Sequence, residues 1–226
     1  LPTEAAWDLG RRSAEQLLDL HLQEEGEHLR HLALSVWGTA TMRNGGEDIA
    51  QLLALIGVRP VWDGPSRRLV DLEAIPADLL GRPRVDVVLR ISGLFRDAFP
   101  QLVEWVDQAQ RLVASLDEDG AINPLAALTR DEGPQGRIYG SAPGAYGAGL
   151  QSLIDSGAWE QRGDLADAFL SWSQWRYAAG CEPEQDRSGL EQALGRVQVV
   201  LHNQDNREHD LLDSDDYYQF HGSLSA

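Results

Sequence analysis

Short apolar segments that alternate with helical patterns constrain the fold of this chain more than any other feature of its sequence. His31–Trp37 and Val85–Ile91 are runs rich in apolar and β-branched residues, which is typical of buried strands. Each is followed by a loop and a helical pattern, over residues 47–56 and 94–116. Strand, loop and helix in alternation predict a parallel sheet covered by helices. Ligands of such sheets bind beyond the carboxyl ends of the strands, which places a site in the loops after these two segments.

Helix and strand signals around these segments complete the first half of the chain. Residues 3–25 are expected to form a helix that Thr3 caps and Gly26 ends. Val58–Trp62 has the apolar character of another strand. With His31–Trp37 and the helix between them, it predicts a βαβ unit.

The character of the sequence changes near residue 120, where residues 117–136 are polar and rich in turn signals. We therefore expect an α/β domain over residues 1–120, with a parallel sheet and flanking helices. A second region over residues 121–226 is expected to be mainly helical and loop-rich. It contains a glycine-rich stretch at 136–149 and helical patterns at 164–179 and 189–202.

The charge of the chain excludes several classes of partner. A net charge of −17 repels phosphate backbones and anionic membrane surfaces, so nucleic acid is not an expected partner. No apolar run approaches the ~20 residues of a membrane span. Cys181 is the only cysteine, which excludes an intrachain disulfide and fits a cytoplasmic setting. The chain begins at Leu1 without Met or a signal sequence, and is expected to be part of a longer polypeptide.

All 19 basic residues are arginine. A chain without lysine has no phosphate-loop lysine, no Schiff-base lysine and no lysine general base. If ATP is consumed, we expect another subunit to hydrolyse it.

The acidic-histidine segment, residues 202–221, holds three of the six histidines and six carboxylates. Imidazole and carboxylate at this density suit a first-row divalent metal. If the segment is helical, Asp205, His209, Asp213 and Asp216 share one face, with Glu208 beside them. Such a face can hold a metal or move protons. A solvated acidic helix with Asp–His pairs is the alternative interpretation.

Two loops offer contacts for a ligand. The stretch 136–149 carries Gly144, Gly147 and Gly149, which allow the backbone to approach a large planar molecule closely, although a loop needed only for packing would have the same composition. In the loop after Trp37, Thr39 provides a polar contact and Arg43 can form an ion pair with a carboxylate.

Several blocks together resemble the large subunit of aerobic cobaltochelatase, the CobN type, and more loosely that of magnesium chelatase. The resemblance covers almost the entire chain, in order. It is carried by the blocks Ser35–Ala50, Ile56–Trp62, Leu80–Val87, Ile91–Phe99, Arg137–Leu150 and Asn203–Tyr218.

The resemblance implies ATP-dependent insertion of Co²⁺ into hydrogenobyrinic acid a,c-diamide during cobalamin biosynthesis. Co²⁺ is then a substrate, ATP with Mg²⁺ acts through AAA+ partner subunits, and no organic cofactor is expected in this chain. Further partners would be the corrin or tetrapyrrole substrate and the upstream part of the large subunit. In this interpretation Glu208 and His209 act as catalytic residues, with Asp205, His209 and Asp213 as metal ligands. The expected ring contacts are Thr39, Arg43, Arg137, Gly144, Tyr146 and Gly147.

Two other functions fit the same residues. One is a magnesium chelatase large subunit, which would insert Mg²⁺ into protoporphyrin IX. The other is a non-catalytic scaffold whose acidic segment docks the AAA+ subunits. Metal or ring affinity would indicate a site, whereas salt-sensitive affinity for the ATPase subunits would indicate a dock.

Overall fold

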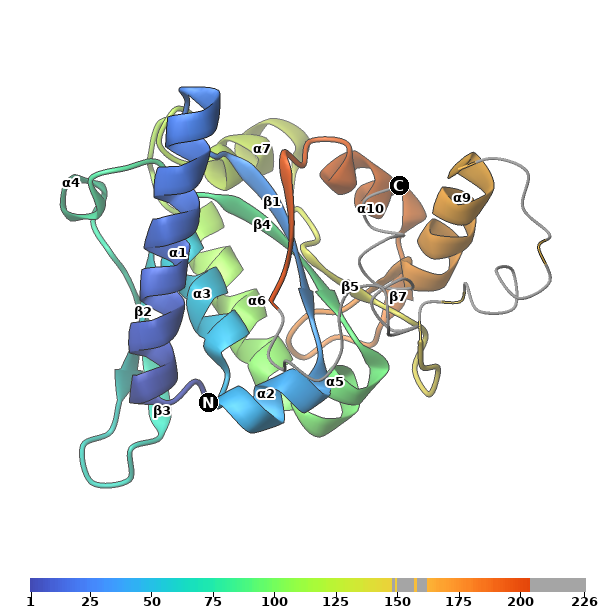
Figure 1. Ribbon diagram of the computed structural model, residues 1–226, viewed down its shortest axis with the longest axis horizontal. Coiled ribbons are helices and arrows are strands. Elements are labelled where there is room, and N and C mark those ends of the chain that lie inside the picture. The colour runs from blue at the N-terminus through green and yellow to red at the C-terminus, as the bar shows by residue number, and fades with distance from the viewer. Residues whose placement is uncertain (148, 150–156, 158–161, 204–226) are drawn as a thin grey trace.

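The main sheet unites strands from the whole length of the chain. The computed structural model describes residues 1–147, 149, 157 and 162–203 (Figure 1). Six strands lie in the order β7-β6-β5-β4-β1-β8. The strands that pair in parallel are β1 (His31–Val36), β4 (Asp86–Ile91), β5 (Ile138–Gly140) and β8 (Val199–His202). β6 (Trp175–Arg176) pairs antiparallel with both β5 and β7 (Glu184–Gln185), so it alone among the described strands of this sheet runs against the others. The predicted fold class, α/β with a mostly parallel sheet and flanking helices, is confirmed.

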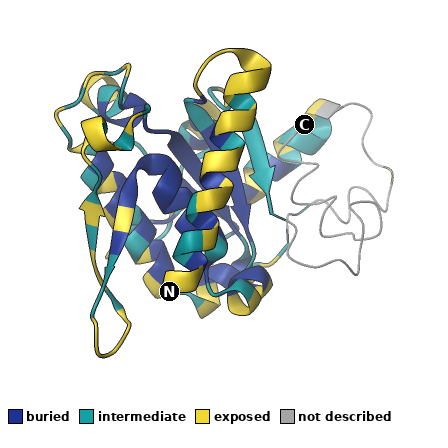
Figure 2. Ribbon diagram, turned by 60° about the vertical axis from the view of Figure 1, so that its left-hand side comes forward, coloured by how far each residue is buried: buried dark blue, intermediate teal, exposed yellow. Residues whose placement is uncertain are grey.

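Helices cover both faces of this sheet. Helices α3 (Glu47–Ile56) and α6 (Pro100–Ala114) pack their apolar residues against Leu34, Leu89 and other apolar residues of β1 and β4. The opposite face is covered by α9 (Arg162–Ser173) and α10 (Arg187–Leu194). Figure 2 shows buried residues concentrated in the sheet and in the helices against it.

Helix α1 (Glu4–Glu25) forms an outer layer on α3. The two helices approach closely at Gly10, where a Cβ atom would lie 2.6 Å from the backbone nitrogen of Gln51. The expected ends of α1 are confirmed. The Thr3 hydroxyl accepts a hydrogen bond from the Ala6 amide, and Gly26 ends the helix with a φ of 75°.

The βαβ unit predicted at His31–Trp62 is wrong. β2 (Val58–Trp62) pairs antiparallel with β3 (Leu69–Ala74) in a separate two-stranded sheet, and β8 occupies the place beside β1. Pro60 has no amide hydrogen to donate, which is tolerated in a strand with a single partner but not in the middle of a sheet.

The helix predicted at 189–202 is also wrong in its second part. α10 ends at Leu194, and Val199–His202 forms β8, because this β-branched run gains hydrogen bonds from the open side of β1. Likewise the helix expected at 164–179 ends at Ser173, and Trp175 lies in β6. β5 to β8 all follow residue 120, so strands from both sides of the expected boundary pair within one sheet.

Four shorter helices complete the described structure. In the stretch expected to be turns, α7 (Pro124–Glu132) begins where Asn123 caps the amide of Ala126. The predicted loop after Trp37 forms the short helix α2 (Gly38–Asn44), while α4 (Ala77–Leu80) and α5 (Gly93–Ala98) flank β4. None of the helices in the described part of the chain combines the length and apolarity that crossing a membrane requires.

Candidate functional site

The carboxyl ends of the four parallel strands meet at one side of the molecule, which we call the carboxyl edge. β1 leads into residues 37–44, β4 into residues 92–97, β5 into residues 141–147 and β8 into Asn203. In Figure 1 the ends of β1, β4 and β8 lie near α2 and α5. This is the side of an open α/β sheet where ligands bind.

A polar row crosses the sheet just before this edge. Ser35 of β1 is in register with Arg90 of β4 and with His202 of β8, so the three side chains project from the same face. Arg90 and Ser35 are both buried. Burial lowers the pKa of Arg90 to about 9. Buried polar groups therefore interrupt the apolar strands next to this edge.

The glycine-rich loop at 141–147 is held in place by Arg96 of α5. The guanidinium Nη1 of Arg96 donates to the carbonyl oxygens of Ser141, Ala142 and Ala145 at 3.3, 2.7 and 3.2 Å. Tyr177 also donates its hydroxyl to the Ser141 carbonyl. The loop conformation therefore depends on a cation supplied by the neighbouring strand-end segment.

Tyr146, in the same loop, is tied to Asp97. The Tyr146 hydroxyl donates to Asp97 Oδ2 at 2.6 Å, and the ring centroid lies 5.6 Å from the Arg96 guanidinium carbon. Arg96 donates to both Asp97 oxygens at 2.6 and 2.9 Å. Hydrogen bonds from Arg96, and then from Tyr146, hold the pKa of the Asp97 carboxyl below its usual value. The hydrogen bond to Asp97 raises the pKa of Tyr146.

The end of the loop is fixed from the other face of the sheet. Trp172 of α9 donates its indole N–H to the Gly147 carbonyl at 3.0 Å, and Arg90 Nη2 lies 3.4 Å from the same oxygen. Gly144 and Gly147 have φ values of 76° and 80°, which favour glycine. Glycine thus permits the backbone conformation of the loop, and hydrogen bonds from Arg96, Arg90 and Trp172 hold that conformation.

The exit of β8 is anchored on α3. Asn203 Nδ2 donates to Asp48 Oδ1 and to Gln51 Oε1, each at 2.6 Å. Both acceptors are buried. The His202 ring packs against the Trp37 ring with centroids 4.6 Å apart. The chain therefore leaves the sheet at a defined point of the carboxyl edge.

Five of the six predicted ring contacts lie at the carboxyl edge. Thr39 and Arg43 are exposed on α2, and Gly144, Tyr146 and Gly147 belong to the glycine-rich loop. These two segments come from different strand ends, and the fold brings both to the same side.

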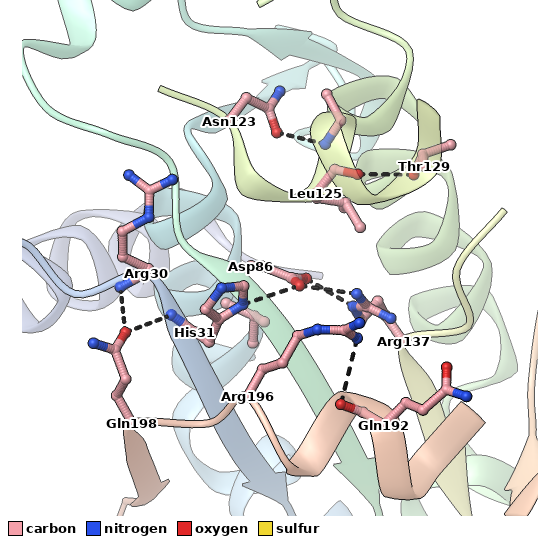
Figure 3. Close-up of polar contacts among 12 residues, drawn as sticks. Arg30, His31, Asp86, Asn123, Leu125, Thr129, Arg137, Gln192, Arg196 and Gln198 are labelled. Carbon is pink, nitrogen blue, oxygen red and sulfur yellow. Dashed lines mark hydrogen bonds and ion pairs between the residues drawn. The ribbon is translucent and has the colours of Figure 1, made fainter. Parts of the chain in front are cut away.

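Arg137, the sixth predicted contact, lies elsewhere. It precedes β5 at the opposite side of the sheet, the amino edge, where Figure 3 shows it beside Asp86 and His31. Its Nε and Nη2 donate to the two oxygens of Asp86 at 2.7 and 2.9 Å, and both side chains are buried. The structure thus engages this guanidinium in an ion pair and separates it from the other five residues.

The predicted metal and catalytic residues Asp205, Glu208, His209 and Asp213 lie outside the described residues. Within the described ranges, no three His, Cys, Asp or Glu side chains are grouped so that they could hold a metal ion. The last described residue before them is Asn203, at the carboxyl edge.

Sequence reasoning missed Arg90, Arg96 and Asp97 at this edge, together with Asp48 on α3. A signal was available for Arg96 and Asp97, which follow the predicted strand by a few residues, where ligand contacts are expected. Asp48 is polar within an otherwise largely apolar helix, which is an indication of a specific partner.

Comparison with known proteins identifies the class of protein to which this fold and site belong. The CobN/Magnesium Chelatase family model matches residues 1–226, so the chain belongs to this family and the resemblance noted in its sequence is confirmed.

Similarity within the family is higher to the cobalt type. The chain is 54% identical to the aerobic cobaltochelatase subunit CobN of Pseudomonas aeruginosa, with 100% of the chain and 19% of that protein aligned. It is 34% identical to a magnesium-chelatase subunit of Chlorobaculum parvum over 99% of the chain and 18% of that protein. The catalytic subunit of cobaltochelatase from Mycobacterium tuberculosis matches with a TM-score of 0.95 and 45% identity, over 99% of this chain and 20% of that one. The chain therefore spans about a fifth of the length of these relatives.

Proposed function

We propose that this chain is a portion of the large, tetrapyrrole-binding subunit of an ATP-dependent cobaltochelatase, which inserts Co²⁺ into hydrogenobyrinic acid a,c-diamide in cobalamin biosynthesis. The observation that carries the proposal is the convergence at the carboxyl edge of an ordered glycine-rich loop, an exposed aromatic ring and the exit of β8. The higher identity to the cobaltochelatase relative than to the magnesium-chelatase relative supports cobalt as the metal.

The carboxyl edge would contact the ring. The loop with Gly144 and Gly147 presents backbone without side-chain bulk, and Tyr146 presents an aromatic face. Thr39 and Arg43 on α2 would contact the polar periphery of the ring, where a guanidinium suits carboxylate side chains. Arg137 would then support the sheet from the amino edge through its pairing with Asp86 and would not reach the ring.

The acidic-histidine segment would handle the metal and the protons. Co²⁺ must lose its water ligands, and the inner ring must lose its N–H protons, before the metal–nitrogen bonds form. Imidazole and carboxylate bind Co²⁺ without the strong retention of thiolates, which suits stepwise transfer. We assign the metal relay to His209, with Asp205 and Asp213 as entry ligands, and proton acceptance to Glu208.

ATP hydrolysis is assigned to AAA+ partner subunits, because the chain contains no lysine to bind phosphates in a phosphate loop. The remaining part of the large subunit is a further partner in this proposal, and a cytoplasmic setting fits the single cysteine.

The test is cobalt insertion by the full-length subunit with its ATPase partners, followed through the absorbance change of the corrin. We expect His209→Ala and Glu208→Gln to abolish insertion while corrin binding and ATP hydrolysis persist. The matched control is His28→Ala, an exposed histidine next to the amino edge. Insertion that survives both substitutions would contradict the assignment of chemistry to this segment.

The same assay separates the alternatives. Insertion of Mg²⁺ into protoporphyrin IX would indicate the magnesium function, which the 34% identity to a magnesium-chelatase subunit favours as the second candidate. If the two variants lose salt-sensitive affinity for the ATPase subunits, and insertion recovers when those subunits are saturating, the acidic segment is a docking element.

A further inference from the structure

Tyr146 is exposed but makes two specific contacts. The residue is 59% exposed, yet its hydroxyl donates to Asp97 and one face of its ring lies over Arg96. An exposed tyrosine ordinarily turns about two side-chain bonds, so fixing this one costs conformational entropy. Its remaining exposed surface is a rigid aromatic wall at the edge of the sheet where ligands bind.

Arg96 and Asp97, which hold the Tyr146 side chain, neutralise each other. Every side-chain nitrogen of Arg96 already donates a hydrogen bond, either to Asp97 or to a carbonyl of the glycine-rich loop. Asp97 neutralises the guanidinium through two contacts. A ligand that meets Tyr146 therefore meets a flat apolar surface on a neutral base, which does not attract carboxylates.

Other exposed apolar side chains belong to the same edge. Leu94 of α5 is 38% exposed, Met42 of α2 is 57% exposed, and Trp172 of α9 is 37% exposed. Two glycines allow the segments to meet. A Cβ atom on Gly93 would lie 2.8 Å from the Tyr146 ring, and one on Gly38 would lie 2.8 Å from the Leu94 side chain.

We infer that Tyr146 binds the flat face of the conjugated macrocycle by stacking, and that Arg96 and Asp97 are positioning residues that hold the tyrosine for this contact. The inference rests on the proposed function and specifies how the ring is recognised at that site. Recognition at Tyr146 depends on the π-surface of the ring and not on its carboxylate side chains. Those charges must be met by other residues, such as Arg43 on α2.

The experiment uses the full-length subunit without Co²⁺ or ATP. Hydrogenobyrinic acid a,c-diamide is titrated at low and high salt, and quenching of tryptophan fluorescence reports binding. Tyr146→Ala is expected to weaken binding by about 10- to 100-fold, equally at both salt concentrations, as for other flat rings on aromatic side chains. Tyr146→Phe keeps the ring but loses the bond to Asp97, and is expected to weaken binding by about threefold. Leu79→Ala, which removes a 75% exposed leucine on α4, is the control and is expected to leave binding unchanged.

The positioning role has its own readout. Asp97→Ala is expected to raise the KM for the ring in the complete insertion assay by about threefold to tenfold while kcat at saturating ring stays unchanged. Asp97→Asn keeps an acceptor for the tyrosine hydroxyl and is expected to recover most of the loss. A fall in kcat without a change in KM would overturn the positioning role.

The outcomes distinguish this inference from the proposed function. If the wild-type subunit binds the ring and Tyr146→Ala binds it equally well, the stacking contact is wrong and the proposed function stands. A loss that vanishes at high salt would also overturn stacking, because it would indicate attraction between charges. If the wild-type subunit binds no ring, the proposed function and the inference fall together.

Discussion

At the amino edge of the main sheet, buried arginines pair with carboxylates of other elements of the core, whereas at the carboxyl edge buried arginines bind the backbone of the glycine-rich loop. Arg96 pairs in addition with its sequence neighbour Asp97. Arg137 pairs with Asp86, and Arg84 donates to both oxygens of Glu118 at 2.7 and 2.8 Å. Arg96 and Arg90 instead hold the carbonyls of the glycine-rich loop. The first arrangement joins elements of the core. The second orders a loop and leaves an aromatic side chain in solvent, so the same residue type stabilises the fold at one edge and shapes a surface at the other.

The largest expected effect tests the amino edge. Asp86→Asn leaves Arg137 buried without its counter-charge and should lower the free energy of unfolding by about 3–5 kcal/mol. Urea denaturation of the 226-residue chain measures this change. Asp8→Asn, which removes an exposed partner of Arg12, is the control and should cost less than about 1 kcal/mol. Equal effects of the two substitutions would show that the buried pair contributes no more to stability than an exposed pair does.

The pH dependence of stability sharpens the same point. Burial alone would raise the pKa of Asp86, but the hydrogen bond from His31 and the charge of Arg137 outweigh it, so the pKa lies below its usual value. A lowered pKa in the folded state adds stability above the unfolded-state pKa near 4, and this stability is lost as the pH falls through the folded-state value. The difference in unfolding free energy between wild type and Asp86→Asn should therefore be constant above about pH 5 and shrink below about pH 4. A difference that grows on acidification would contradict this.

A glycine substitution tests the carboxyl edge. Gly93→Ala would place a Cβ atom 2.6 Å from the Ala145 carbonyl oxygen, so the glycine-rich loop must shift. We expect a loss of about 1–3 kcal/mol in the free energy of unfolding, as for other overpacked sites. Ring affinity in the full-length subunit should fall as well. Gly64→Ala meets no atom within 4 Å and serves as the control. Unchanged ring affinity in the Gly93 variant would show that the loop contributes nothing to the surface.

The smallest expected effect concerns the exit of β8. Asn203→Ala removes a donor from the buried acceptors Asp48 and Gln51 and should cost about 1–2 kcal/mol. Asn203→Asp places two carboxylates together and should cost more, and adding Asp48→Asn should restore part of the loss. Thermal or urea unfolding of the single and double variants measures the coupling. Additive losses would show that the two residues do not interact.

The sequence predicted what local signals determine and missed what depends on distant partners. α1, β1 and β4 follow from a capping threonine and from apolar β-branched runs. The local pattern predicts a helix where β8 lies. The strand forms only because it pairs with β1, and a local pattern does not reveal a partner so far away in the sequence. Pro60 carried a signal against a central strand, and Asn123 followed by Pro124 was a recognisable helix start.

The residues of the candidate site show the same contrast between local signals and distant partners. The loops after β1 and β4 were expected at the carboxyl edge from topology alone, and they lie there. Arg96 and Asp97 acquire their roles only when the glycine-rich loop packs on α5, so their partners follow them by more than 40 residues. Arg137 shows the converse. Its residue type suits a carboxylate of a ligand, but in the folded chain its carboxylate partner is Asp86.

The position of β8 beside β1 also sets the order of events during synthesis. Gln198, just before β8, receives hydrogen bonds from the backbone of Arg30 and His31, and His31 lies 167 residues earlier. At ribosomal rates of about 5–20 residues per second, β1 has one unpaired side for on the order of ten seconds or more. An unpaired strand edge is a template for association with other chains, so the nascent polypeptide needs protection during this interval. Pairing of β8 with β1 then completes the sheet late in synthesis.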